Sequence, residues 1–201
     1  MRVTLVLGCA YVVGAIPFSN IAARRTRGVD LRQVGSGTVG GTALYRVAGF
    51  VPLAVAGVFD VSKGAVGPLL AGDRPVLAAT AGGAAVAGHN WSPFLRGAGG
   101  RGVAPALGAL LVNAWPGTLL LLVPMIVGKW AGETGVGTLI GLLALVPVLG
   151  WLYGSTAAVA GGAVAVPMLI KRLTGNAPPV ADPAPTYLNR LVFDRDHRSR
   201  V

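Results

Sequence analysis

Long apolar runs, separated by short polar segments, make up most of the chain. A helix that crosses a bilayer needs about 20 predominantly apolar residues. Five runs meet or approach this length, at Val3–Ala23, Phe50–Ala71, Pro75–Leu95, Gly135–Gly150 and Trp151–Ile170. The pattern therefore predicts an all-α integral membrane protein. It also predicts that the first run is an uncleaved spanning helix.

A further apolar run, from residue 103 to residue 128, is interrupted by Asn113, Pro116 and Gly117. If it forms one helix, the chain crosses the membrane six times and its basic tail lies outside. If it forms two short helices, Val103–Ala114 and Gly117–Val127, there are seven crossings and the tail lies inside. Arginine-rich segments normally stay in the cytoplasm. We therefore expect seven transmembrane helices, some short or re-entrant, with the N-terminus outside and the C-terminus cytoplasmic.

Composition supports a membrane location. Hydrophobic residues make up 53% of the 201 residues and charged residues only 12%, whereas a soluble domain is about 25% charged. The net charge of +10 comes from basic residues that border apolar runs. Because no nucleic-acid-binding motif accompanies them, we expect a lipid bilayer as the partner and no nucleic acid. The single cysteine, Cys9, excludes an intramolecular disulfide.

The last 26 residues differ from the rest. We expect residues 1–175 to form the transmembrane domain and residues 176–201 a proline-rich, basic cytoplasmic tail. The prolines of this tail, from Pro178 to Pro185, predict an extended linker. Tyr187–Phe193 is amphipathic, which favours a position on the membrane surface. A disordered, solubilising tail is the alternative.

Two glycine-rich segments are the candidate sites for chemistry. Glycines let backbone N–H groups converge on an anion, and an arginine can donate two hydrogen bonds to its oxygens. The first segment is closed by Arg46, and the second contains Arg101. The candidate phosphate-binding residues in them are Gly35, Ser36, Gly37, Thr38, Gly40, Thr42, Gly99, Gly100 and Gly102. The alternative is a flexible loop in which Arg46 serves only to orient the protein.

Charged residues also occur inside apolar runs. Asp60 and Lys63 are three residues apart, so they share one helix face. Because an isolated charge in the membrane is costly, we expect a pair, which is either functional or a structural ion pair. His89 is either a general base or a residue that holds the loop by hydrogen bonds. The two histidines are far apart and there is one cysteine, so we expect no metal site and no cofactor.

Five ordered stretches resemble one family. They are Gly14–Ser19, Val29–Gly37, Asp60–Gly64, Gly88-His89 with Pro93-Phe94, and Gly99–Ala104. Together they resemble the motifs of the bacterial acyl-phosphate:glycerol-3-phosphate acyltransferase family, known as PlsY. The resemblance extends from about Tyr11 to Leu111.

The resemblance implies a multi-pass protein of the bacterial inner (plasma) membrane with its active site facing the cytoplasm. Such an enzyme takes acyl phosphate and glycerol 3-phosphate as substrates. It transfers the fatty acyl group to the 1-hydroxyl and yields lysophosphatidic acid for phospholipid biosynthesis. Substrate phosphate oxygens assist, so no protein base is required. By motif position, the catalytic residues implied are Ser36, Arg46, Lys63, His89 and Arg101.

The chain departs from the family pattern at several polar positions. Thr38 and Ala43 replace asparagines, Ala98 and Arg101 replace lysines, and Val166 and Leu169 stand where the third motif has a histidine and an asparagine. Three alternatives stay open, the last of them suggested by the interrupted helices and the charges inside apolar runs. They are a diverged paralogue with another acceptor or donor, a non-catalytic membrane protein that binds lipid phosphate, and a transporter.

Overall fold

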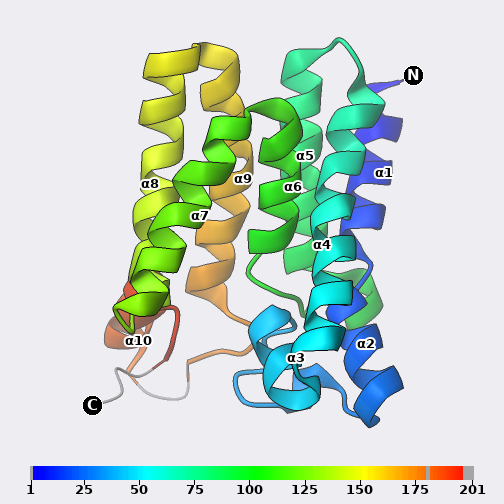
Figure 1. Cartoon of the computed structure of the whole chain (residues 1–201), viewed down its shortest axis with the longest axis vertical. Coiled ribbons are helices and arrows are strands. Elements are labelled where there is room, and N and C mark those ends of the chain that lie inside the picture. The colour runs from blue at the N-terminus through cyan, green and yellow to red at the C-terminus, as the bar shows by residue number, and fades with distance from the viewer. Residues whose placement is uncertain (1, 180–181, 197–201) are drawn as a thin grey trace.

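The computed structural model describes residues 2–179 and 182–196, and in this part of the chain all regular structure is helical. Figure 1 shows the helices as a bundle. In chain order they are α1 (Val3–Ala15), α2 (Phe18–Arg27), the 3₁₀ turn η1 (Leu31–Gln33), α3 (Gly41–Ala48), α4 (Phe50–Ala71), α5 (Pro75–Asn90), the 3₁₀ turn η2 (Pro93–Leu95), α6 (Val103–Asn113), α7 (Trp115–Trp130), α8 (Thr134–Tyr153), α9 (Ser155–Thr174) and α10 (Pro183–Phe193).

The two ends of the bundle differ in what they carry. In Figure 1 the N-terminus lies at one end, beside the turn that joins α4 to α5. The opposite end carries α2, α3 and α10. The arginines that flank the first glycine segment lie on α2, η1 and α3, so the basic part of the chain gathers at that end.

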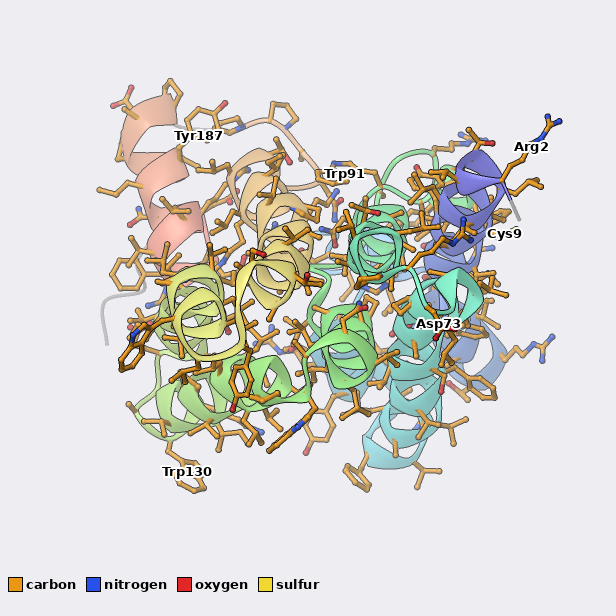
Figure 2. The ribbon with its side chains drawn as sticks, turned by 90° about the horizontal axis from the view of Figure 1, so that it is seen from above. Arg2, Cys9, Asp73, Trp91, Trp130 and Tyr187 are labelled. Atoms are coloured by element: carbon orange, nitrogen blue, oxygen red, sulfur yellow. The ribbon has the colours of Figure 1, made fainter. Side chains whose placement is uncertain are left out.

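The outer surface is apolar, as a lipid environment requires. Side chains such as Phe50 and Val51 are 70% and 72% exposed, and Trp130, which Figure 2 shows at the rim of the bundle, is 83% exposed. Four helical segments are long and apolar enough to cross a membrane, at Val3–Arg27, Phe50–Ala71, Thr134–Tyr153 and Ser155–Thr174. The expectation of an all-α integral membrane protein is therefore confirmed.

The sequence predicted one continuous helix for the first apolar run, but the structure divides it into two. It breaks at Ile16 and Pro17, between α1 and α2, because proline lacks an N–H and its ring clashes with the preceding turn. The carbonyls released by the break find other donors. Ser92 Oγ donates to Ala15 O at 2.6 Å, and Lys63 Nζ donates to Ile16 O at 2.8 Å. The break thus ties the first run to two later segments.

The run from residue 103 to residue 128 forms two helices, α6 and α7, in agreement with the second of the two expectations. The chain turns at Ala114, where φ is −160°, and the Gly117 N–H donates to Ala114 O. With 11 residues, α6 is only about 16 Å long, against about 30 Å for the hydrocarbon core. It is covered by α4, α5 and α7, which pack against it.

Glycines allow the helices to approach each other closely. A side chain at Gly88 of α5 would collide with the carbonyl of Tyr11 on α1, and one at Gly108 of α6 would collide with the carbonyl of Val61 on α4. Small residues at such positions let helix backbones meet in a membrane, where packing rather than the hydrophobic effect drives association. These contacts allow α5 to pack closely against α1, and α6 against α4.

The tail contains a docked helix, α10, and not the disordered segment that was the alternative for Tyr187–Phe193. The predicted linker is shorter than expected, because Pro183 and Pro185 belong to this helix. Pro183 and Pro185 lie in the first turn of α10, where proline costs no hydrogen bond. Only 3% of the Arg190 side chain is exposed, and it donates to Thr174 O at 3.1 Å and to Ala177 O at 3.0 Å. The end of α10 is thus fixed to the end of α9. His197, the second histidine of the chain, lies outside the described residues.

Candidate active site

The two glycine segments lie against each other at the end of the bundle. We call residues 35–42 the first glycine loop and residues 97–102 the second glycine loop. The Val39 N–H donates to Gly99 O at 3.0 Å, which joins the loops directly. In the first loop, Gly35 and Gly37 have φ of +56° and +68°, a conformation that glycine adopts without strain. Ser36 Oγ lies 3.0 Å from Thr38 Oγ1, so two hydroxyls share this loop.

The approach to the first loop is anchored by a carboxylate and an amide. Asn20 Oδ1 accepts the Leu31 N–H at 2.8 Å. Asp30 forms ion pairs with Arg24 at 2.5 Å and Arg32 at 2.6 Å. Hydrogen bonds from the Arg32 side chain hold the pKa of the Asp30 carboxyl well below its usual range. The carboxylate therefore stays ionised and keeps two arginines at the base of the loop.

The second loop lies over the end of α5. The Gly97 N–H donates to Ser92 O at 2.8 Å, and the Gly100 N–H donates to His89 O at 3.2 Å. A side chain at Gly100 would collide with the His89 imidazole and with the Val39 carbonyl. Glycine is therefore required where the second loop crosses both the histidine and the first loop.

A buried polar cluster lies beneath the loops. Asp60 Oδ1 is 2.6 Å from Lys63 Nζ, and Asp60 Oδ2 accepts a hydrogen bond from Ser19 Oγ at 2.9 Å. His89 Nδ1 lies 3.9 Å from Asp60 Oδ1. The exposed fractions of Asp60 and Lys63 are only 3% and 2%. Their charges are therefore directed at each other and at the α1–α2 break, and not at the membrane.

A small cavity joins this cluster to the loops. Asp60, Ser19 and His89 line it from below, and Val39 and Gly99 line it from the two glycine loops. The cavity places a carboxylate, an imidazole and a hydroxyl under the point where the loops cross.

Arg101 leaves the second loop towards α9 and the tail. Its Nη1 donates to Lys171 O at 2.7 Å, and its Nε is 2.8 Å from Asp194 Oδ1. Arg172 Nε also faces Asp194 Oδ1, at 3.8 Å. Burial raises the pKa of the Asp194 carboxyl, and Arg101 and Arg172 oppose this effect. A carboxylate of the tail thus lies on a residue that the sequence assigns to phosphate binding.

Arg46 occupies a different position from the other candidates. It lies on α3, directly after the first loop, and its side chain is exposed. Leu44 and Ala48 of the same helix are buried and fix the helix in place. The structure therefore brings most candidate residues to one end of the bundle: Ser36, the loop glycines, Arg101 and the Asp60–Lys63–His89 cluster. Arg46 lies at the exposed side of this end.

The sequence interpretation missed several polar residues of the site. Ser19 and Ser92 contact the cluster and the α1–α2 break, and both are buried. Lys171 is 1% exposed and its Nζ lies 5.5 Å from the centre of the Trp91 ring. Asn176, which was assigned to the tail, bonds to both glycine loops. No spacing signal marks these residues, because each contact joins segments far apart in the chain.

The side chains that commonly bind metals are dispersed in the described part of the chain. Within residues 2–179 and 182–196, no group of three or more histidine, cysteine, aspartate or glutamate side chains gathers to hold an ion. The loops themselves carry the hydroxyls of Ser36 and Thr38 and the Arg101 guanidinium, which are partners of anions.

Comparison with known proteins gives a consistent set of relatives. Residues 4–178 match the family model described as glycerol-3-phosphate acyltransferase. A glycerol-3-phosphate acyltransferase of Dehalococcoides mccartyi (strain CBDB1) is 34% identical, over 98% of this chain and 90% of the relative. One from Synechococcus sp. (strain CC9902) is 37% identical, over 86% of this chain and 88% of the relative.

A solved structure has the same fold. It is the glycerol 3-phosphate form of PlsY (YgiH), described as an integral membrane glycerol 3-phosphate acyltransferase. The two structures superpose with a TM-score of 0.78 and are 25% identical in sequence, over 98% of this chain and 96% of the other.

Proposed function

The chain belongs to the glycerol-3-phosphate acyltransferase family, and from this premise we propose that its acyl donor is an acyl phosphate held by the two glycine loops. Family membership makes the protein a membrane acyltransferase of phospholipid biosynthesis that acts on glycerol 3-phosphate. The product of the proposed reaction is lysophosphatidic acid, acylated at the 1-hydroxyl.

The observation that carries this proposal is the joining of the two loops. Val39 N–H to Gly99 O places two glycine-rich backbones side by side, with Ser36 and Thr38 on one and Arg101 on the other. A reaction between acyl phosphate and glycerol 3-phosphate brings two phosphate groups together. Each needs N–H groups and cations, and holding both in place supplies much of the rate enhancement for an activated donor.

All bonds and protons of the proposed reaction are accounted for without a protein base. The 1-hydroxyl oxygen of glycerol 3-phosphate attacks the acyl carbonyl carbon, and the bond from that carbon to the phosphate oxygen breaks. Inorganic phosphate leaves, and the hydroxyl proton passes to a phosphate oxygen of the substrates. In this scheme Ser36, Arg46 and Arg101 bind phosphate and the developing charge.

His89 and Lys63 fit a supporting role in this scheme. The His89 imidazole lies directly under Gly100, and the Lys63 ammonium is held by Asp60 and the Ile16 carbonyl. We assign both residues to positioning the loops from below. Arg101 is held by Asp194 in this structure, so we expect substrate phosphate to compete with that carboxylate.

For the membrane arrangement, we propose seven crossings, with the α1–α2 segment counted once. The N-terminus is then outside, and the tail and the active site face the cytoplasm of the bacterial cell. Figure 1 shows the N-terminus at one end of the bundle and the loops, α2 and α10 at the other. The arginines of α2 and η1 lie at the loop end, which the positive-inside rule assigns to the cytoplasm.

The proposal is tested by comparing two acyl donors. Purified protein in lipid is supplied with glycerol 3-phosphate and either palmitoyl phosphate or palmitoyl-coenzyme A. Because the thioester carries no phosphate next to its acyl carbon, we expect kcat/KM to be at least about 100-fold higher with palmitoyl phosphate. Equal or better turnover of the thioester would contradict the assignment of acyl phosphate as donor.

A further inference from the structure

Asn176 connects the two glycine loops to the end of α9. Its Nδ2 donates to Gly37 O at 2.9 Å in the first loop and to Gly99 O at 2.9 Å in the second loop. Its Oδ1 accepts the Gly99 N–H at 3.1 Å. An asparagine amide has two N–H donors and one carbonyl acceptor. Both donors and the acceptor are therefore engaged by the backbones of the two loops.

The segment that carries Asn176 is itself held firmly. The Gly175 N–H donates to Lys171 O and ends α9. Arg190 of α10 then donates to Thr174 O on one side of Asn176 and to Ala177 O on the other. Asp196 pairs with Arg190 Nε at 2.6 Å and keeps its guanidinium in place. Asn176 is thus a fixed point between the tail helix and the loops.

We propose that Asn176 is a positioning residue for acyl transfer, which holds the two phosphate-binding loops in register. This inference rests on the proposed function. Within the described residues, the loops also share a direct backbone hydrogen bond, from Val39 N–H to Gly99 O, so loss of the amide removes a large part of the hydrogen bonding that joins them. Two anion sites that move apart bind their substrates less tightly, and a displacement of about 1 Å costs up to about 100-fold in rate.

The alternative is that Asn176 only stabilises the turn that follows α9 and does not position the loops for substrate. In that case its loss lowers stability or the fraction of active protein, but the remaining active molecules bind substrate normally. The Michaelis constant separates the two roles, since an inactive fraction lowers kcat and leaves KM unchanged.

The experiment compares Asn176→Ala and Asn176→Gln with the wild type. Asn189→Ala is the matched control, because Asn189 is a half-buried asparagine of α10, which packs on α8 and α9. Two quantities are measured in each protein. The first is the KM for palmitoyl phosphate and for glycerol 3-phosphate. The second is the hydrogen-exchange rate of the Gly99 amide, which needs no turnover.

We expect Asn176→Ala to raise KM for at least one substrate by about tenfold and to speed exchange at Gly99 by at least about tenfold. Asn176→Gln keeps the amide and should recover part of both losses, and Asn189→Ala should change neither. If Asn176→Ala does not fold, the Gln variant carries the test, with smaller shifts in the same direction.

Unchanged KM values together with unchanged Gly99 exchange would overturn the inference. The proposed function fails differently. A wild-type protein that does not turn over palmitoyl phosphate, while Asn176→Ala still exposes the Gly99 amide, would remove the acyl-phosphate assignment and retain the role of Asn176 in joining the loops.

Discussion

Replacement of Arg46 by alanine should lower kcat/KM for acyl transfer by about 10²- to 10³-fold, the usual effect of removing one donor to developing charge. Arg46 lies on α3 directly after the first glycine loop, and its side chain is exposed. Helix α3 is held by Leu44 and Ala48, which are buried. The substitution therefore leaves the packing of α3 intact, and the apparent melting temperature should stay within about 2 °C of the wild type.

Arg27→Ala is the matched control for Arg46→Ala. Arg27 is also an exposed arginine at the loop end of the bundle, in the last turn of α2. We expect this variant to keep at least about half of the wild-type kcat/KM, since an exposed surface charge contributes little. If Arg46→Ala retains most of its activity, Arg46 does not bind substrate. If both variants lose activity equally, the effect is one of general surface charge.

Replacement of Lys63 by methionine should have the largest effect on stability. The Lys63 ammonium lies 2.6 Å from Asp60 Oδ1. Its loss leaves a buried carboxylate that keeps the Ser19 hydroxyl and the more distant His89 imidazole as neighbours but has lost its cation. Breaking a buried ion pair from one side costs about 3–5 kcal/mol. For a chain of this size, that corresponds to a fall of about 10 °C in the apparent melting temperature.

The double variant Asp60→Asn/Lys63→Met separates an ion-pair role from a catalytic role. Removing both charges avoids the unpaired carboxylate, so we expect at least about half of the lost melting temperature to return. We also expect kcat/KM for acyl transfer to stay within about tenfold of the wild type. The reason is that we assign the ion pair to positioning the loops and not to contact with substrate. A double variant that folds normally but is more than about 100-fold less active would instead place Lys63 in direct contact with substrate.

Local patterns predicted most of the helices. The long apolar run that forms α4 matched the predicted Phe50–Ala71, and Asn113 with Pro116 and Gly117 indicated the separation of α6 from α7. The break at Pro17 was missed, because the apolar run extends on both sides of it and no charged residue marks the break. The helix at Pro183–Phe193 was missed in part because its first-turn prolines were interpreted as a linker.

The site was predicted only where its residues follow one another in the chain. The glycine loops were recognised from their own sequence, and Asp60 with Lys63 from their spacing. Asn176 could not be recognised, because its partner Gly37 is 139 positions away. The pairing of Asp194 with Arg101 was missed for the same reason. Such contacts depend on how α9 and the tail fold back, which no local pattern encodes.

The formation of lysophosphatidic acid tests the central claim most directly. Purified wild-type protein in lipid is incubated with palmitoyl phosphate and radiolabelled glycerol 3-phosphate, and both products are quantified over time. The account predicts that labelled lysophosphatidic acid and inorganic phosphate appear in equal amounts, and that Arg46→Ala slows both together. Release of phosphate without lysophosphatidic acid, or no turnover by the folded wild type, would contradict it.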